Sequence, residues 1–145
     1  MSNERIIGGL AERVRNLETR EPRPTMWEVW HSAGLIDGSA VSPIETPHRI
    51  YNLTGRDLTL VKVFISLGVA PTSQAVIVDI EMDAGGTIFA AAGDRPSIAV
   101  AAFTDDAAVT KTTTWPDGSY LVAYIDQQDT AGDAENLTVQ VVYHV

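Results

Sequence analysis

The chain has 145 residues, a length that suits one domain with a short appendage. On folding, a chain of this size buries roughly two thirds of the surface that it exposes when unfolded. Nineteen acidic against ten basic side chains give a formal net charge of −9, which disfavours binding to the phosphate backbone of nucleic acids. Cysteine is absent, and this excludes disulfides, thiolate metal sites and thiol nucleophiles.

The first 21 residues carry apolar side chains at the spacing of a short coiled-coil helix. In one heptad register Ile7 and Val14 occupy a, Leu10 and Leu17 occupy d, Arg13 occupies g and Glu18 occupies e. Arg13 then pairs with Glu18 of a neighbouring helix, the contact that selects partners in coiled coils. These six residues are the expected oligomerisation site, and the order Arg-apolar-x-x-apolar-Glu resembles the trimerisation motif of three-stranded coiled coils. We therefore expect a homotrimer.

Two alternatives stay open for this segment. β-Branched residues at a with Leu at d favour a dimer, and an ordinary amphipathic helix on its own domain shows the same apolar residues. The repeat covers only about two heptads, and helices of under about 12–15 residues are marginal in water. If the helix trimerises, the domain that follows must supply much of the interface. The N-terminus has no apolar signal segment and no run of about 18 apolar residues follows, so neither secretion nor membrane insertion is expected.

Residues 22–47 are expected to form an ordered connector. Pro22 and Pro24 end the helical pattern, because proline cannot continue a helix and forces the preceding residue into extended geometry. Residues 34–47 are rich in turn formers. We expect Trp27 and Trp30 to pack at the base of the domain, since such rings bury large apolar areas. The alternative is a platform on which a ligand stacks.

From residue 48 to residue 145 the pattern changes to the two-residue alternation of strands. Residues 76–82 and 137–143 alternate cleanly between apolar and polar side chains, as half-buried strands do. Residues 120–126 are apolar on both faces, which predicts a strand inside a sheet. Because no helical pattern separates the strands, the fold class is mainly β: an antiparallel β-sandwich or jelly-roll domain of about eight strands.

Two details of this domain can be predicted more closely. Residues 58–60 and 61–65 alternate out of phase, which predicts a bulge near Leu60 or burial of both faces. Residues 83–86 supply the positive-φ positions of a hairpin, and residues 115–118 match a type I turn with Pro second and Gly last. The other expected strands are 49–53, 87–91, 97–103 and 109–114.

Several segments of this domain resemble, in the same order, the small β-domains of tailed-bacteriophage virion proteins. They include Leu67-Gly68-Val69-Ala70-Pro71-Thr72, Val76-Ile77-Val78-Asp79-Ile80, Arg95-Pro96-Ser97-Ile98-Ala99 and Asn136-Leu137-Thr138-Val139-Gln140-Val141. The resemblance covers residues 58–145, and the N-terminal helix is similar to the stalks by which phage fibres trimerise. The chain departs from the family at residues 83–86, where members often have a tight Asn-Gly hairpin.

The resemblance implies a structural virion protein that is made in the host cytoplasm and becomes part of the virion. Its expected form is a homotrimeric appendage, such as a tail fibre, head fibre or minor tail protein, whose partners are further copies and other tail or capsid proteins. One alternative is a capsid decoration protein. The other is a module that binds a host-surface glycan or receptor through exposed aromatic side chains such as Tyr120 or Trp115.

No catalytic or metal-binding pattern stands out, so we expect no enzyme, no cofactor and no metal. His31, His48 and His144 lie too far apart for a ligand motif. Five aspartates offer oxygen ligands for calcium, but the EF-hand spacing is absent and a solvated acidic loop is the expectation. They are Asp105, Asp106, Asp126, Asp129 and Asp133. No phosphate loop, nucleophile elbow or paired carboxylates can be recognised.

Overall fold

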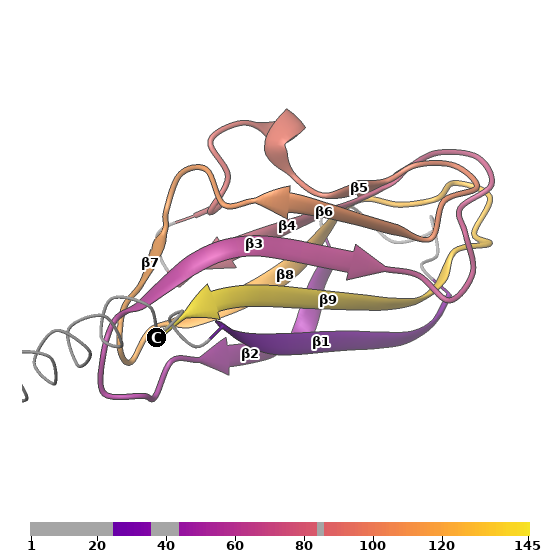
Figure 1. The fold of residues 1–145 in the computed structure, drawn as a ribbon. Coiled ribbons are helices and arrows are strands. Elements are labelled where there is room, and N and C mark those ends of the chain that lie inside the picture. Colours follow the sequence, from indigo (N-terminus) through magenta and orange to yellow (C-terminus); the bar gives the residue numbers. More distant parts are fainter. Residues whose placement is uncertain (1–24, 36–43, 84–85) are drawn as a thin grey trace, which may run out of the picture.

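The computed structural model describes residues 25–35, 44–83 and 86–145 of the chain. The predicted coiled-coil helix of residues 1–21 lies outside this range. The described residues form nine strands and one short 3-10 helix (Figure 1). The elements are β1 Thr25–Leu35, β2 Ile44–Tyr51, β3 Leu58–Ser66, β4 Val76–Met82, η1 Ala92–Asp94, β5 Ser97–Ile98, β6 Thr104–Ala108, β7 Thr114–Trp115, β8 Tyr120–Gln127 and β9 Glu135–His144. None of the described helices is long and apolar enough to cross a membrane.

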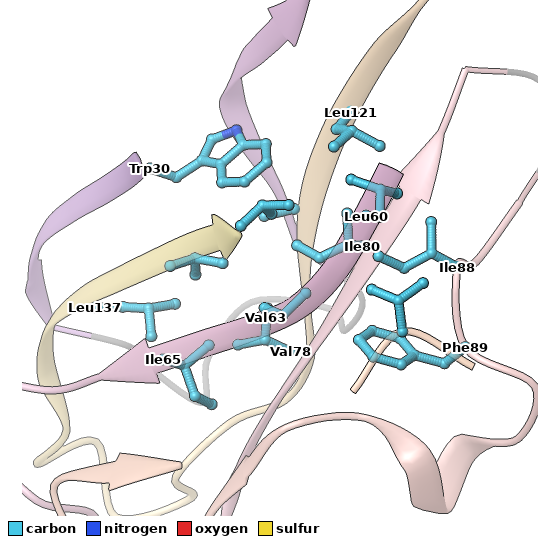
Figure 2. Close-up of a cluster of buried hydrophobic side chains, with 14 of the residues drawn as sticks. Trp30, Leu60, Val63, Ile65, Val78, Ile80, Ile88, Phe89, Leu121 and Leu137 are labelled. Atoms are coloured by element: carbon cyan, nitrogen blue, oxygen red, sulfur yellow. The ribbon is translucent and has the colours of Figure 1, made fainter. Parts of the chain in front are cut away.

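The strands form two antiparallel sheets, as the sequence predicted. One sheet has the order β1-β9-β3-β6, with β7 also paired to β3, and the other has the order β2-β8-β4-β5. Side chains from both sheets meet in a single hydrophobic cluster, which Figure 2 shows in close-up. Val63 and Ile65 come from the first sheet, and Val78, Ile80 and Leu121 come from the second.

The bulge predicted near Leu60 is present in β3. The register between β3 and β9 shifts between Leu60 and Lys62, and residues 58–66 form one strand. Before the shift Leu58 and Leu60 are buried, whereas after it Val63 and Ile65 are buried. The extra residue reverses the phase of the alternation, so that both halves of the strand turn their apolar side chains into the core.

The prediction that residues 120–126 lie inside a sheet is also confirmed. β8 has β2 on one side and β4 on the other. Leu121 and Ala123 point into the core, and Val122, on the outer face of the same strand, is only 3% exposed. The strand is therefore covered on both faces over these residues.

The expected connector of residues 22–47 contains a strand of the domain, so the strands begin earlier than residue 48. β1 covers Thr25–Leu35 and pairs with β9 over most of its length. Turn formers at residues 34–47 suggested a connector, but Gly34 lies in β1, and Thr46 and Pro47 lie in β2. Trp30 is 3% exposed and belongs to the core, which agrees with the packing interpretation and excludes Trp30 as a ligand platform.

The segments between β4 and β8 differ from the expectation in their strand bounds. Of residues 97–103 only Ser97–Ile98 form a strand, β5, and of residues 109–114 only Thr114 does, as the first residue of β7 (Thr114–Trp115). The strand β6 lies between them at Thr104–Ala108. The sequence did not predict β6, because this strand lies at the edge of its sheet and an edge strand can be made of polar residues. Thr87 makes one isolated bridge to Glu81, and residues 88–91 leave the sheet.

The expected turn at residues 115–118 is displaced by one position. The bond that closes it runs from Ser119 N to Pro116 O, and Gly118 N donates instead to Asn52 O. Gly118 thereby becomes the third residue of the turn with φ of 78°, a left-handed conformation that favours glycine.

Candidate functional site

The residues that the sequence singled out do not come together in one site. The six predicted oligomerisation residues, Ile7, Leu10, Arg13, Val14, Leu17 and Glu18, all lie outside the described residues. In the described part, we consider three clusters of polar and charged side chains that contain buried residues: one around Asp129, one around Arg95 and one around Asn52.

The Asp129 carboxylate joins two loops at one end of the domain. Its side chain is fully buried, and Oδ2 accepts a hydrogen bond from Thr72 N at 3.0 Å. Oδ1 accepts bonds from Ser73 N at 2.9 Å and Gln74 N at 3.3 Å, and the Ser73 hydroxyl donates to it as well. Burial alone raises the pKa of Asp129, but these donors outweigh it and hold the pKa well below its usual range. The carboxylate therefore stays ionised.

Neighbouring hydroxyls extend this cluster across the same two loops. Thr72 Oγ1 donates to Asp133 Oδ2 at 2.7 Å, and Ser73 Oγ lies 2.8 Å from Thr130 Oγ1. Ala131 N donates to Ser73 Oγ at 2.9 Å. The loop between β3 and β4 and the loop between β8 and β9 are thus fastened together; we call the Asp129 carboxylate and its four donors the Asp129 clasp. Both loops lie at the end of the domain away from the C-terminus (Figure 1).

The expectation of a solvated acidic loop is wrong for Asp129, which is buried and shares Thr72 as a donor with Asp133. The other three aspartates have partners elsewhere. Asp105 Oδ2 accepts a bond from Ser97 N at 2.6 Å, and Asp106 pairs with Lys62 at 3.1 Å. Asp126 pairs with Arg95. Across the described residues no group of three His, Asp or Glu side chains is placed to hold a metal ion.

Arg95 forms a second cluster, on the outer face of the four-stranded sheet. Its Nη2 lies 2.9 Å from Asp79 Oδ2 and its Nη1 lies 2.6 Å from Asp126 Oδ2. The Thr87 hydroxyl donates to Asp79, which is 5% exposed. Burial raises the pKa of Asp79, although the Thr87 bond and the Arg95 charge oppose the rise. The cluster fastens the segment between β4 and β5 to β4 and β8.

Asn52 occupies a third cluster, which sequence reasoning missed. Its side chain is 1% exposed, and Nδ2 donates to Arg56 O and Trp115 O, each at 2.9 Å. Oδ1 accepts bonds from Thr54 N at 3.2 Å and Thr54 Oγ1 at 2.7 Å. The signal was the Asn-Leu-Thr-Gly stretch, in which an Asn side chain bonds to the backbone two residues on.

The two aromatic residues suggested for ligand binding differ in exposure. Trp115 is 1% exposed, packs edge-on against Tyr143 and donates from Nε1 to Ser119 O at 3.3 Å, so it offers no binding surface. The Tyr120 ring lies 5.4 Å from the ring of Tyr51, which is 50% exposed. The Arg49 guanidinium lies 4.7 Å from the centre of the Tyr120 ring.

Comparisons with known proteins give a likeness among solved structures but none among families or curated proteins. No family model matches the chain, and no curated protein matches it significantly. Among solved structures, a chain from the capsid asymmetric unit of cyanophage Pam1 is similar, with 14% sequence identity and a TM-score of 0.43. The match covers 87% of this chain and 93% of that chain. We draw no functional conclusion from a likeness at this level.

Proposed function

We propose that the chain is a structural component of a tailed-phage virion, a homotrimeric tail or head fibre or minor tail protein that displays its β-domain. One observation carries the proposal. Two of the segments that resemble virion β-domains fall on long strands of a two-sheet antiparallel domain: residues 76–80 lie in β4 and residues 136–141 in β9. The polar clusters around Asp129, Arg95 and Asn52 fasten loops to the sheets, which suits a mechanical role.

The location of the protein in the particle tests this proposal. Gold-labelled antibodies on intact virions, together with quantitative mass spectrometry, give position and copy number. Few copies at the tail or at single vertices support the appendage. Many copies spread over the capsid shell support the alternative, a decoration protein. Absence of the protein from purified particles contradicts both.

The contribution of the N-terminal helix can be measured separately. Replacing both Leu10 and Leu17 with Ala is expected to lower the stability of the oligomer by several kcal/mol per chain, since a buried Leu→Ala change costs about 2–5 kcal/mol. Thermal unfolding at several protein concentrations measures the change, because the stability of an oligomer depends on concentration. The control is Glu12→Ala, outside the a, d, e and g positions. If the melting temperature of the double variant is unchanged, the helix does not contribute to the interface.

A second candidate function is the binding of a host-surface glycan, and the Tyr51–Tyr120 pair favours it. Exposed tyrosine rings provide flat apolar surface with a polar edge, which suits stacking against sugar rings. We expect Tyr51→Ala to abolish binding on a glycan array or to whole host cells, while Leu53→Ala, at a neighbouring exposed side chain, leaves it unchanged. If the unmodified protein binds no host surface, the structural role alone remains.

A further inference from the structure

The outer face of the five-stranded sheet is continuous across four strands. The register places Val29 of β1 opposite Gln140 of β9, Gln140 opposite Phe64 of β3, and Phe64 opposite Asp106 of β6. These residues point away from the core, because their chain neighbours Trp30, Val139 and Ile65 are buried in it and successive strand residues point to opposite faces. We define the β1–β9–β3 face by six residues: Val29, His31, Phe64, Thr138, Gln140 and Val142.

This face carries no net charge in a strongly acidic protein, since Lys62 of β3, which lies on it opposite Val142, is paired with an aspartate. The chain has nineteen acidic side chains against ten basic ones, yet none of the six residues of the face is a carboxylate. The nearest is Asp106, on the edge strand β6, where Lys62 pairs with it. The outer face of the other sheet carries the carboxylates Asp79 and Asp126, which Arg95 pairs. Because no carboxylate is among the six residues of the β1–β9–β3 face, a second acidic copy can approach it with little direct repulsion.

The side chains of the face suit the centre of a protein interface. Val29 is 45% exposed, and Phe64 and Val142 are half-buried. The polar side chains around them can form hydrogen bonds. Two of these side chains already contact each other, since His31 Nδ1 lies 3.0 Å from Thr138 Oγ1. Interface centres are depleted of charged residues, and buried polar groups in them need partners.

The order of the chain places this face beside the proposed stalk. β1 begins at Thr25, seven residues after Glu18, and extended chain spans at most about 3.6 Å per residue, or roughly 25 Å here. β1 is also the edge strand of its sheet. Copies tied together through residues 1–21 would therefore hold their β1 strands close to one another. Because so short a helix cannot hold an oligomer alone, the domains must supply further contact.

We propose that the β1–β9–β3 face is the surface through which copies of this chain pack against one another. The proposal rests on the homotrimer of the proposed function and names the part of the domain that holds it together. Its occupant is a second copy, which leaves the Tyr51–Tyr120 pair on the opposite sheet free.

Sedimentation equilibrium of the full chain with charges added to the face tests this proposal. We expect the double variant Val29→Glu and Gln140→Glu to raise the dissociation constant of the oligomer about 100-fold or more, because like charges that meet in an interface cost several kcal/mol. The matched control is Tyr51→Glu, at an equally exposed position on the other sheet, which should leave the dissociation constant unchanged. Circular dichroism checks that each variant is folded.

A spin label gives a second measurement that adds no charge. Because the chain has no cysteine, Gln140→Cys and Tyr51→Cys each provide one labelling site. We expect the label at residue 140 to be immobilised in the oligomer and the label at residue 51 to be mobile. The proposal is overturned if the label at residue 140 is mobile, or if the double variant leaves the dissociation constant of the oligomer unchanged. Either result contradicts only this packing surface and not the homotrimer. A monomeric unmodified protein contradicts the homotrimer itself.

Discussion

The Asp129→Ala variant is expected to lose about 2–4 kcal/mol of its free energy of unfolding, because a hydrogen bond to a charged acceptor contributes about 1.5–3 kcal/mol and water replaces only part of this at the exposed Thr72 and Ser73. The change leaves the backbone N–H groups of Thr72, Ser73 and Gln74 without the carboxylate that accepts from them. Urea unfolding at neutral pH measures the loss. The control is Asp133→Ala, which removes one hydrogen bond and should cost about 1 kcal/mol. Equal losses in the two variants would contradict a special role for the Asp129 clasp.

From the Asp129 clasp we also predict how the free energy of unfolding falls at acid pH. The pKa of Asp129 is lowered from its ordinary value of 3.8, so the folded protein holds the ionised form more strongly than the unfolded chain does. Its contribution to stability is therefore complete above pH 3.8 and is lost as the pH falls further towards the folded pKa. Unfolding free energies should show no contribution from Asp129 to pH dependence between pH 5 and 7. Below pH 4 the fall should be less steep in Asp129→Asn than in the unmodified protein.

The Arg95→Met variant is expected to lose about 3–5 kcal/mol at neutral pH, because removing one partner of a buried ion pair leaves the other charge uncompensated. The charge left behind is the carboxylate of Asp79, which is 5% exposed. Urea unfolding measures the loss. The control is Lys62→Met: Lys62 and Asp106 are 45% and 53% exposed, and such surface pairs contribute only about 0–1 kcal/mol.

The loss caused by Arg95→Met should shrink in acid. The pKa of Asp79 is already raised, so the folded protein favours its protonated form, and this contribution to stability is present below pH 3.8 and lost as the pH rises through the folded pKa. Without Arg95, the hydrogen bonds from the Thr87 hydroxyl and the Ile80 backbone are left to oppose protonation of Asp79. The variant should therefore lie closer to the unmodified protein at pH 4.5 than at pH 7. The second substitution Asp79→Asn should recover much of the loss at pH 7, and no recovery would mean that the lost packing of Arg95 dominates.

The parts of the fold that the sequence predicted well are those where apolar side chains set the pattern. The phase change at Leu60 predicted the bulge in β3, and the doubly apolar run at residues 120–126 predicted an interior strand. Burial imposes a strict alternation on such strands, and the alternation is visible in the residue types themselves. β6 was missed because residues 104–108 lie at an edge, where polar side chains are tolerated.

The polar clusters could not be predicted from local patterns, because their partners are far apart in the chain. Asp129 accepts bonds from residues more than 50 positions earlier, and it looked like one of several carboxylates in a solvated loop. Arg95 and Asp126 meet across 31 positions. Only the pairing of β4 with β8 brings these groups together, and that pairing follows from the whole topology.

The pairing of β1 with β9 also determines when the domain can be completed during synthesis. β9 lies between β1 and β3, and His31 meets Thr138 across 107 positions of the chain. The β9-facing edges of β1 and β3 therefore have no neighbour until β9 has been synthesised. Contacts of such long range slow folding, since a large loop must close before they form. Until β9 emerges, the nascent chain thus exposes β1 and one edge of β3, whose other edge pairs with β6 and β7, and this is the interval in which a chaperone or a second nascent chain would meet them.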